Sequence, residues 1–221
     1  MKIFIIGVAG GVGRRIAEQL VKSGDVPLGL VRKPEQADEL VANGIQTTMG
    51  DLVAMSRNEL AEKMLGSDAV IFSAGAGGKG GPEERTQVDG NGPGKAAAAA
   101  KQAGIRRFIL VSVFPEAWRE RHMNESFEHY MIEKKRAETE LVQTDIDWLI
   151  VRPSALTNEP GTGRVDLGLA KTHTEIARDD LATTVTALLR TPDLNREIIE
   201  LTGGDVAIEA AIDTFRNTRR R

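Results

Sequence analysis

Three residues in the sequence have types and positions that suit proton transfer: Ser112, Tyr130 and Lys134. Tyr130 and Lys134 are four residues apart in a segment that predicts a helix, so both side chains lie on one face of it. A nearby ammonium, together with the positive nicotinamide of an oxidised cofactor, favours the phenolate, and lowering a tyrosine pKa from about 10 by about three units needs roughly 4 kcal/mol. Tyr130 could then give a proton to a carbonyl oxygen that Ser112 also hydrogen-bonds. The alternative interpretation is a half-buried helical tyrosine beside a surface lysine.

A glycine turn stands near the start of the chain, between a short apolar run and a segment with helical periodicity. Its glycines are Gly7, Gly10 and Gly13. In a dinucleotide site, the first glycine lets the chain turn off the strand, the second admits a pyrophosphate, and the third lets the helix pack closely. Gly11 and Val12 lie in the same turn and are also expected to bind the cofactor, and the N–H groups of the first helical turn after it would point at the phosphates. An ordinary glycine-rich turn is the simpler alternative, but the strand–turn–helix context favours a dinucleotide site.

The end of the second expected strand indicates which dinucleotide binds. A site selective for NAD(H) carries an acidic residue about 20 residues after the glycines, where it holds the ribose 2′-hydroxyl. This sequence has Arg32 and Lys33 there instead. A guanidinium is a planar charged fork that suits a 2′-phosphate, and Arg14 or Arg15 could close over the same group. The pattern therefore predicts NADP(H) rather than NAD(H), with solvated surface charges as the alternative.

Two further segments are expected beside the cofactor because each follows a strand. Asp51 and Leu52 come after the third expected strand and are placed to flank the adenine. Ser73, Ala74 and Gly75 open a long glycine-rich loop after the fourth. Parallel sheets bind their ligands at the carboxyl ends of the strands, where these segments would lie.

Alternating strands and helices would bring these residues to one edge of a sheet. The sequence predicts strands, most of them apolar runs, at residues 2–6, 25–32, 45–49, 68–72, 107–112 and 147–152. Helical patterns follow at residues 14–21, 34–43, 56–65, 92–103 and 128–143, with long loops at 73–89 and 113–127. This alternation predicts an α/β fold of Rossmann type: a doubly wound parallel sheet with strand order 3-2-1-4-5-6 and helices on both faces.

The pattern is less regular after residue 153. Residues 154–171 are expected to form a loop, followed by a helix at 177–189, a strand at 197–201 and a helix at 206–215. The length suits a single NAD(P)-binding domain over residues 1–221. Residues 154–221 would add small elements on the substrate side rather than an independent domain.

Composition limits the classes of function. A net charge of -3 argues against nucleic acid or an anionic membrane as a main partner. The absence of cysteine excludes disulfides and sulfur-ligated metals, and His122, His129 and His173 have no metal-binding spacing, so no metal site is predicted. The sequence shows no signal-peptide pattern and no apolar run long enough to span a membrane. We expect a cytoplasmic monomer or homodimer that acts on a small molecule.

Several short motifs occur in a fixed order over residues 1–153. They are Gly7-x-x-Gly10-x-x-Gly13, Gly50-Asp51-Leu52, Val88-Asp89-x-x-Gly92, the run at 107–112, and Val151-Arg152-Pro153. Together they resemble the short-chain dehydrogenase/reductase superfamily, and most closely its atypical, NAD(P)H-binding, epimerase-like branch. The chain is shorter than the full-length epimerases of that branch, which implies a small substrate lobe.

The resemblance implies a catalytic set. Ser112 matches the family's serine at the end of the fifth strand, and Tyr130 with Lys134 matches its Tyr-x-x-x-Lys pair. Asp89 stands where a helper asparagine is usual, and a carboxylate there could hold a water or the Lys134 ammonium. Lys134 would also position the nicotinamide ribose, and Pro153 would join the cofactor-binding residues.

Three functions remain open. The first is an NADP(H)-dependent oxidoreductase, the second an NADP(H)-binding sensor or regulator without turnover, and the third an epimerase or dehydratase that returns the hydride to its substrate. The geometry of the catalytic set beside an open pocket would distinguish the first from the second, and no sequence feature separates the first from the third. Phe114, Trp118 and His122 are equally compatible with lining a substrate pocket and with local loop packing.

Overall fold

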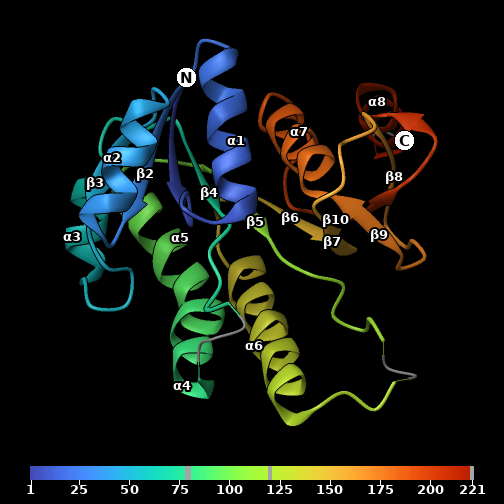
Figure 1. Cartoon of the computed structure of the whole chain (residues 1–221), viewed down its shortest axis with the longest axis horizontal. Helices are drawn as coiled ribbons and strands as arrows, with labels where there is room; N and C mark the ends of the chain where they lie inside the picture. Colours follow the sequence, from blue (N-terminus) through green and yellow to red (C-terminus); the bar gives the residue numbers. More distant parts are fainter. Residues whose placement is uncertain (78–80, 119–120, 220–221) are drawn as a thin grey trace.

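A mostly parallel sheet forms the centre of the computed structural model, which describes residues 1–77, 81–118 and 121–219 (Figure 1). Seven parallel strands are β1 (Lys2–Ile6), β2 (Val26–Val31), β3 (Gln46–Met49), β4 (Ala69–Phe72), β5 (Arg107–Val111), β6 (Asp147–Pro153) and β10 (Glu197–Gly203). Two antiparallel strands, β8 (Arg164–Gly168) and β11 (Val206–Ala207), extend one edge. Over the described residues the order is β11-β8-β10-β6-β5-β4-β1-β2-β3, which confirms the predicted 3-2-1-4-5-6 arrangement.

Helices cover both faces of the sheet, as predicted. They are α1 (Gly11–Lys22), α2 (Pro34–Ala42), α3 (Arg57–Met64), α4 (Pro82–Arg85), α5 (Gly92–Gln102), α6 (Glu125–Val142), α7 (Arg178–Leu189) and α8 (Ile208–Arg219). Figure 1 shows α1 and α7 side by side on one face, and α5 beside α6 on the other. None of the helices in the described ranges has an apolar stretch long enough to cross a membrane.

Strand β1 shows how the sheet separates two hydrophobic clusters. Successive side chains of a strand point to opposite faces. Ile3 and Ile5 therefore pack with the buried faces of α1, α7 and α8, whereas Phe4 and Ile6 pack with those of α3 and α5. Residues beyond 153 contribute to the first cluster, so the C-terminal elements share a core with the glycine-turn helix α1.

Local signals fix several helix ends where they were expected. Ser56 forms a capping box with Glu59: the Ser56 hydroxyl accepts from the Glu59 N–H, and the Glu59 carboxylate accepts from the Ser56 N–H. Pro34 opens α2, and Asn43 closes it before Gly44, which has a φ of +77°. Asn124 caps α6 by accepting from the Phe127 N–H at 2.9 Å, so this helix begins three residues earlier than predicted.

Two expected loops contain regular structure. Much of the segment predicted as a loop at 73–89 is helical, because α4 continues through a π-helix, η1 (Thr86–Asn91), directly into α5. The segment 154–171 is not a loop either: it contributes β8 and a short strand β7 (Ala155–Thr157), which pairs with β9 (Glu175–Ala177). These strands have three to five residues, too short for a periodicity that the sequence would reveal.

Candidate active site

A cleft of about 910 Å³ lies along the carboxyl ends of β1, β2, β4, β5 and β6. Fifteen of the predicted site residues line it: Gly7, Gly10, Gly11, Val12, Arg32, Asp51, Leu52, Ser73, Ala74, Gly75, Asp89, Ser112, Tyr130, Lys134 and Pro153. Two predicted residues, Gly13 and Lys33, do not line it. Most of the predicted site residues therefore lie on the cleft wall, because residues that follow parallel strands meet at one edge of the sheet.

The glycine turn depends on a positive φ at Gly7 and on the absence of side chains at Gly7, Gly10 and Gly13. Gly7 has a φ of +92°, and a Cβ there would lie 2.5 Å from the backbone nitrogen of Ala74. A Cβ on Gly13 would lie 2.3 Å from the carbonyl oxygen of Gly7, so Gly13 serves close helix–strand packing rather than the cleft surface. A Cβ on Gly10 would meet Gly7 oxygen alone, at 3.2 Å, which leaves room above Gly10. This cradle fits a pyrophosphate at the N-terminus of α1.

Arg178 is a cleft residue that the sequence reasoning missed. It opens α7, and its side chain would lie 3.3 Å from a Cβ built on Gly11. Its Nη1 donates to Asn158 Oδ1 at 2.9 Å and to the carbonyl oxygen of Leu156 at 3.3 Å. The guanidinium thus adds positive charge over the glycine turn, where phosphates would lie. No motif marks Arg178, because only the packing of α7 beside α1 brings it there.

Arg32 is the predicted 2′-phosphate residue that faces the cleft. Its side chain is exposed and pairs with Glu84 across 3.7 Å, whereas Lys33 is the N-cap residue of α2 and lies outside the cleft wall. The expectation that Arg14 or Arg15 closes over the same group does not hold. Arg14 is bound by both oxygens of Glu39, and Arg15 donates to Asp179 at 2.7 Å.

Lys134 and Asp89 form a buried ion pair in the cleft. The Lys134 Nζ lies 3.3 Å from Asp89 Oδ1, and the two side chains are 5% and 1% exposed. The other oxygen, Asp89 Oδ2, accepts from the Ala76 N–H at 3.0 Å. The same ammonium lies 5.7 Å from the centre of the Tyr130 ring. Asp89 thus holds the ammonium beside the tyrosine and ties it to the loop after β4.

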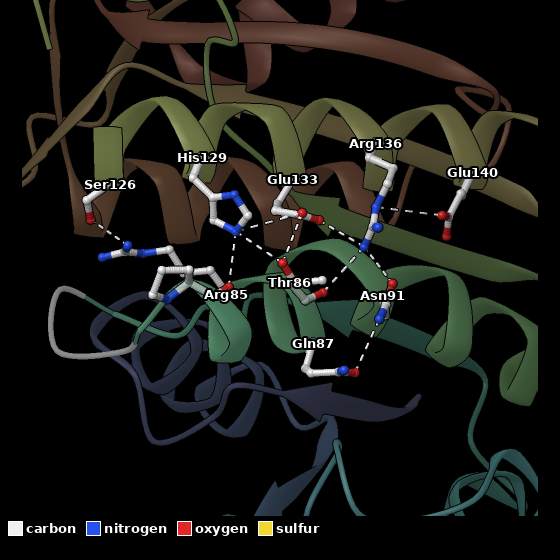
Figure 2. A network of polar contacts seen from close by, with 10 residues as sticks. Arg85, Thr86, Gln87, Asn91, Ser126, His129, Glu133, Arg136 and Glu140 are labelled. Atoms are coloured by element: carbon white, nitrogen blue, oxygen red, sulfur yellow. Dashed lines mark hydrogen bonds and ion pairs between the residues drawn. The ribbon is translucent and has the colours of Figure 1, made fainter. Parts of the chain in front are cut away.

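A polar network anchors the π-helix η1 to α6 (Figure 2). Because η1 carries Asp89 and α6 carries Lys134, this network helps to hold the two side chains opposite each other. The Thr86 hydroxyl donates to Glu133 Oε1 at 3.0 Å, and Arg136 Nη2 lies 2.8 Å from Glu133 Oε2. Glu133 is the residue before Lys134, and Thr86 is one turn before Asp89. A π-helix inside a helical run often marks a functional site, and here its widened turn carries a site carboxylate.

Burial sets the protonation of Tyr130. Burial raises the pKa of Tyr130 above its ordinary value, and the Lys134 ammonium opposes this only in part. Burial alone would lower the pKa of Lys134, but the Tyr130 phenolate, where it forms at high pH, and the Asp89 carboxylate outweigh burial, so the pKa of Lys134 is raised. The Lys134 ammonium alone therefore does not bring the pKa of Tyr130 below its ordinary value. Tyr130 keeps its proton and Lys134 its charge at neutral pH, which suits Tyr130 to act as a proton donor.

Ser112 is buried and has a partner that was not anticipated. Its hydroxyl donates to Glu138 Oε1 at 2.5 Å, and Glu138 Oε2 accepts from Arg152 Nη2 at 2.5 Å. A serine hydroxyl has one hydrogen and two acceptor positions, so Ser112 must release Glu138 before it can donate to a substrate oxygen. The sequence signal for Glu138 was available: it continues the four-residue spacing of Tyr130 and Lys134 on one face of α6.

The aromatic residues expected in the loop after β5 differ in their positions relative to the cleft. Phe114 and Trp118 line the cleft, whereas His122 is exposed and is not part of its wall. His173, from the segment between β8 and β9, lines the cleft and was missed. These rings gather at the end of the cleft near Ser112 and Tyr130.

Comparison with known proteins gives consistent matches. Residues 7–192 match the model of a family described as NAD(P)H-binding. The uncharacterized sugar epimerase YhfK of Bacillus subtilis is 37% identical over 213 residues, covering 96% of this chain and 99% of that protein. The solved oxidoreductase ylbE from Lactococcus lactis has a TM-score of 0.85 and 30% identity, covering 98% of this chain and 97% of that one. A provisionally named NAD-dependent epimerase/dehydratase structure from Bacillus halodurans has a TM-score of 0.88 and 28% identity, covering 97% and 99%.

Proposed function

Because the chain belongs to the NAD(P)H-binding family, we propose that it is an NADP(H)-dependent oxidoreductase that transfers hydride to or from a carbonyl or alcohol group of a small molecule. One observation carries this proposal: half-buried Tyr130 and the buried Lys134–Asp89 ion pair open onto the same cleft as the glycine turn. A protein that only sensed the cofactor would not need a protonated tyrosine and a buried ammonium at the far end of that cleft.

The residues divide into binding and chemical roles. The glycine turn and Arg178 would hold the pyrophosphate, and Asp51 and Leu52 would flank the adenine. When bound, NADPH supplies the hydride. Tyr130 gives its proton to the carbonyl oxygen, and the Lys134 ammonium stabilises the phenolate that this leaves. Asp89 keeps the ammonium in place.

The proposal includes a preference for NADP(H). Support comes from Arg32, an exposed guanidinium on the cleft wall at the position where NAD(H)-selective sites carry an acid. We expect NADPH to bind at least about tenfold more tightly than NADH, which corresponds to about 1.4 kcal/mol. Calorimetric titration measures both affinities.

The variant Arg32→Asp should invert this preference. Lys33→Asp is the matched control, since it makes the same charge change at the next residue, outside the cleft wall. Equal affinities of NADPH and NADH for the parent protein, or equal effects of the two variants, would refute the assignment of Arg32.

An epimerase is the second candidate, because a relative that covers nearly the whole chain is named as a sugar epimerase. A turnover screen with NADPH separates the three functions. An oxidoreductase consumes one NADPH per product, whereas an epimerase interconverts substrates with no net change in NADPH. Tight NADPH binding with neither reaction, over a broad panel of carbonyl compounds and sugars, would make the regulator the better interpretation.

A further inference from the structure

The substrate end of the cleft is an aromatic chamber, formed by Phe114, Trp118, Phe127, Tyr130 and His173. The whole chain has only six Phe, two Trp and one Tyr, and four of these nine rings line this chamber. A concentration of scarce aromatic residues beside a proton donor is a chemical feature that the dinucleotide fold does not itself require.

The rings of the chamber contact one another in a chain. His173 meets Phe114 edge-to-face with ring centres 5.2 Å apart, and it meets Trp118 in the same way at 5.0 Å. Phe127 links Trp118, at 6.0 Å, to Tyr130, at 6.3 Å. This series of ring contacts therefore ends at Tyr130, which we assign as the proton donor.

The chamber is assembled from three separate parts of the chain. Phe114 and Trp118 come from the connection after β5, Phe127 and Tyr130 from the first turns of α6, and His173 from the segment between β8 and β9. Trp118 and Phe127 are half-buried, which leaves part of each ring facing the cleft.

Trp118 is held in a costly backbone conformation. Its φ is +58°, in the left-handed region that costs a non-glycine residue stability. Such conformations persist where the surrounding structure imposes them, and they concentrate at functional sites. The packing of the indole between His173 and Phe127 supplies that constraint.

We propose that the substrate is a planar aromatic ketone, whose conjugated rings stack in the aromatic chamber with the carbonyl oxygen at Tyr130. This rests on the proposed function. Flat π systems gain from edge-to-face and offset contacts with such walls, and aliphatic rings of equal size gain less. In the reaction, the carbonyl carbon accepts the hydride of NADPH and its oxygen takes the Tyr130 proton. The C=O bond becomes CH–OH, NADP⁺ is formed, and water returns a proton to Tyr130.

Ligand binding can be measured without the reaction. The probes are 2-acetonaphthone and, as the non-aromatic match, cyclohexyl methyl ketone. The chain has two tryptophans: Trp118 in the chamber, and Trp148, which is buried at the start of β6, at the end of that strand away from the cleft. Trp148→Phe therefore leaves Trp118 as the sole indole reporter, and Trp118→Phe leaves the distant one.

We expect 2-acetonaphthone to quench the fluorescence of Trp148→Phe saturably, after correction for probe absorbance, and to leave that of Trp118→Phe without saturable change. Calorimetry on the parent protein should give 2-acetonaphthone an affinity about tenfold above that of the aliphatic ketone, as one or two aromatic contacts would supply. Trp118→Ala should remove most of this difference. Calorimetry does not depend on the fluorescent variants, so it decides the question if either folds poorly.

The outcomes distinguish a failure of the aromatic-ketone proposal from a failure of the proposed oxidoreductase function. Equal or tighter binding of the aliphatic ketone or of a hexose phosphate, or no binding of 2-acetonaphthone, overturns the aromatic-ketone proposal while leaving NADP(H)-dependent chemistry open. Saturable binding of 2-acetonaphthone, with no consumption of NADPH by it or by any carbonyl compound of the turnover screen, supports the chamber's ligand class and overturns the oxidoreductase assignment instead.

Discussion

Removing one partner of the Asp89–Lys134 ion pair should destabilise the protein more than removing both. The charged atoms are 3.3 Å apart and both side chains are almost fully buried. With an effective dielectric constant of about 20, their attraction is about 5 kcal/mol, and breaking a buried pair typically costs about 3–5 kcal/mol. In a chain of this length, 1 kcal/mol lowers the melting temperature by about 2–4 °C, so Lys134→Met should melt about 6–20 °C earlier. The cost arises because the Asp89 carboxylate would remain buried without its counter-charge.

A double-mutant cycle followed by thermal and urea unfolding tests this expectation. The variants are Lys134→Met, Asp89→Asn and their combination, with an expected coupling energy of about 2 kcal/mol or more. Lys135→Met is the control, because its partner Glu116 is exposed and surface pairs contribute about 0–1 kcal/mol. The reasoning fails if Lys134→Met unfolds no more easily than Lys135→Met, or if the Asp89 and Lys134 effects add without coupling.

Two further predictions concern stability. Gly13→Ala should lower the free energy of unfolding by about 2–3 kcal/mol, because the new Cβ would lie 2.3 Å from the carbonyl oxygen of Gly7. Gly81→Ala is the control, since a Cβ there meets nothing within 4 Å. Equal urea midpoints for the two variants would contradict the steric argument. The folded-state pKa values of Tyr130 and Lys134 both lie above their ordinary values of 10.0 and 10.5. Their contribution to stability is therefore complete below about pH 10 and is lost as the pH rises further. Melting temperatures measured across this range should fall less steeply for Tyr130→Phe than for the parent, and parallel curves would contradict it.

The sheet order could be predicted because local signals and chain connectivity agree over the first six strands. Most of these strands are short apolar runs that alternate with helical patterns, and right-handed crossovers leave few alternative orders. The short strands β7, β8 and β9 could not be predicted, since their pairing depends on contacts with distant parts of the chain. The π-helix η1 could not be predicted for the same reason. No local pattern marks it, and the contact of Thr86 with Glu133 on α6 helps to hold it.

The sequence predicted which residues belong to the candidate site better than it predicted their protonation and hydrogen bonding. Ser112, Tyr130 and Lys134 do meet in one cleft, as their positions after strand five and on the next helix indicated. The raised pKa of Tyr130 could not be foreseen, because it depends on how deeply the ring is buried. The donation from Ser112 to Glu138 likewise depends on a rotamer choice that spacing does not specify.

The central claim is that Tyr130 donates a proton to a substrate carbonyl, and the steady-state kinetics of Tyr130→Phe test it most directly. On a ketone that the parent protein reduces with NADPH, kcat/KM should fall by about 10²–10⁴-fold, while the Kd for NADPH stays within about twofold. The lost hydroxyl is the proton donor, and removing it leaves the glycine turn and Arg32 untouched. Full activity of Tyr130→Phe on that ketone would contradict the account.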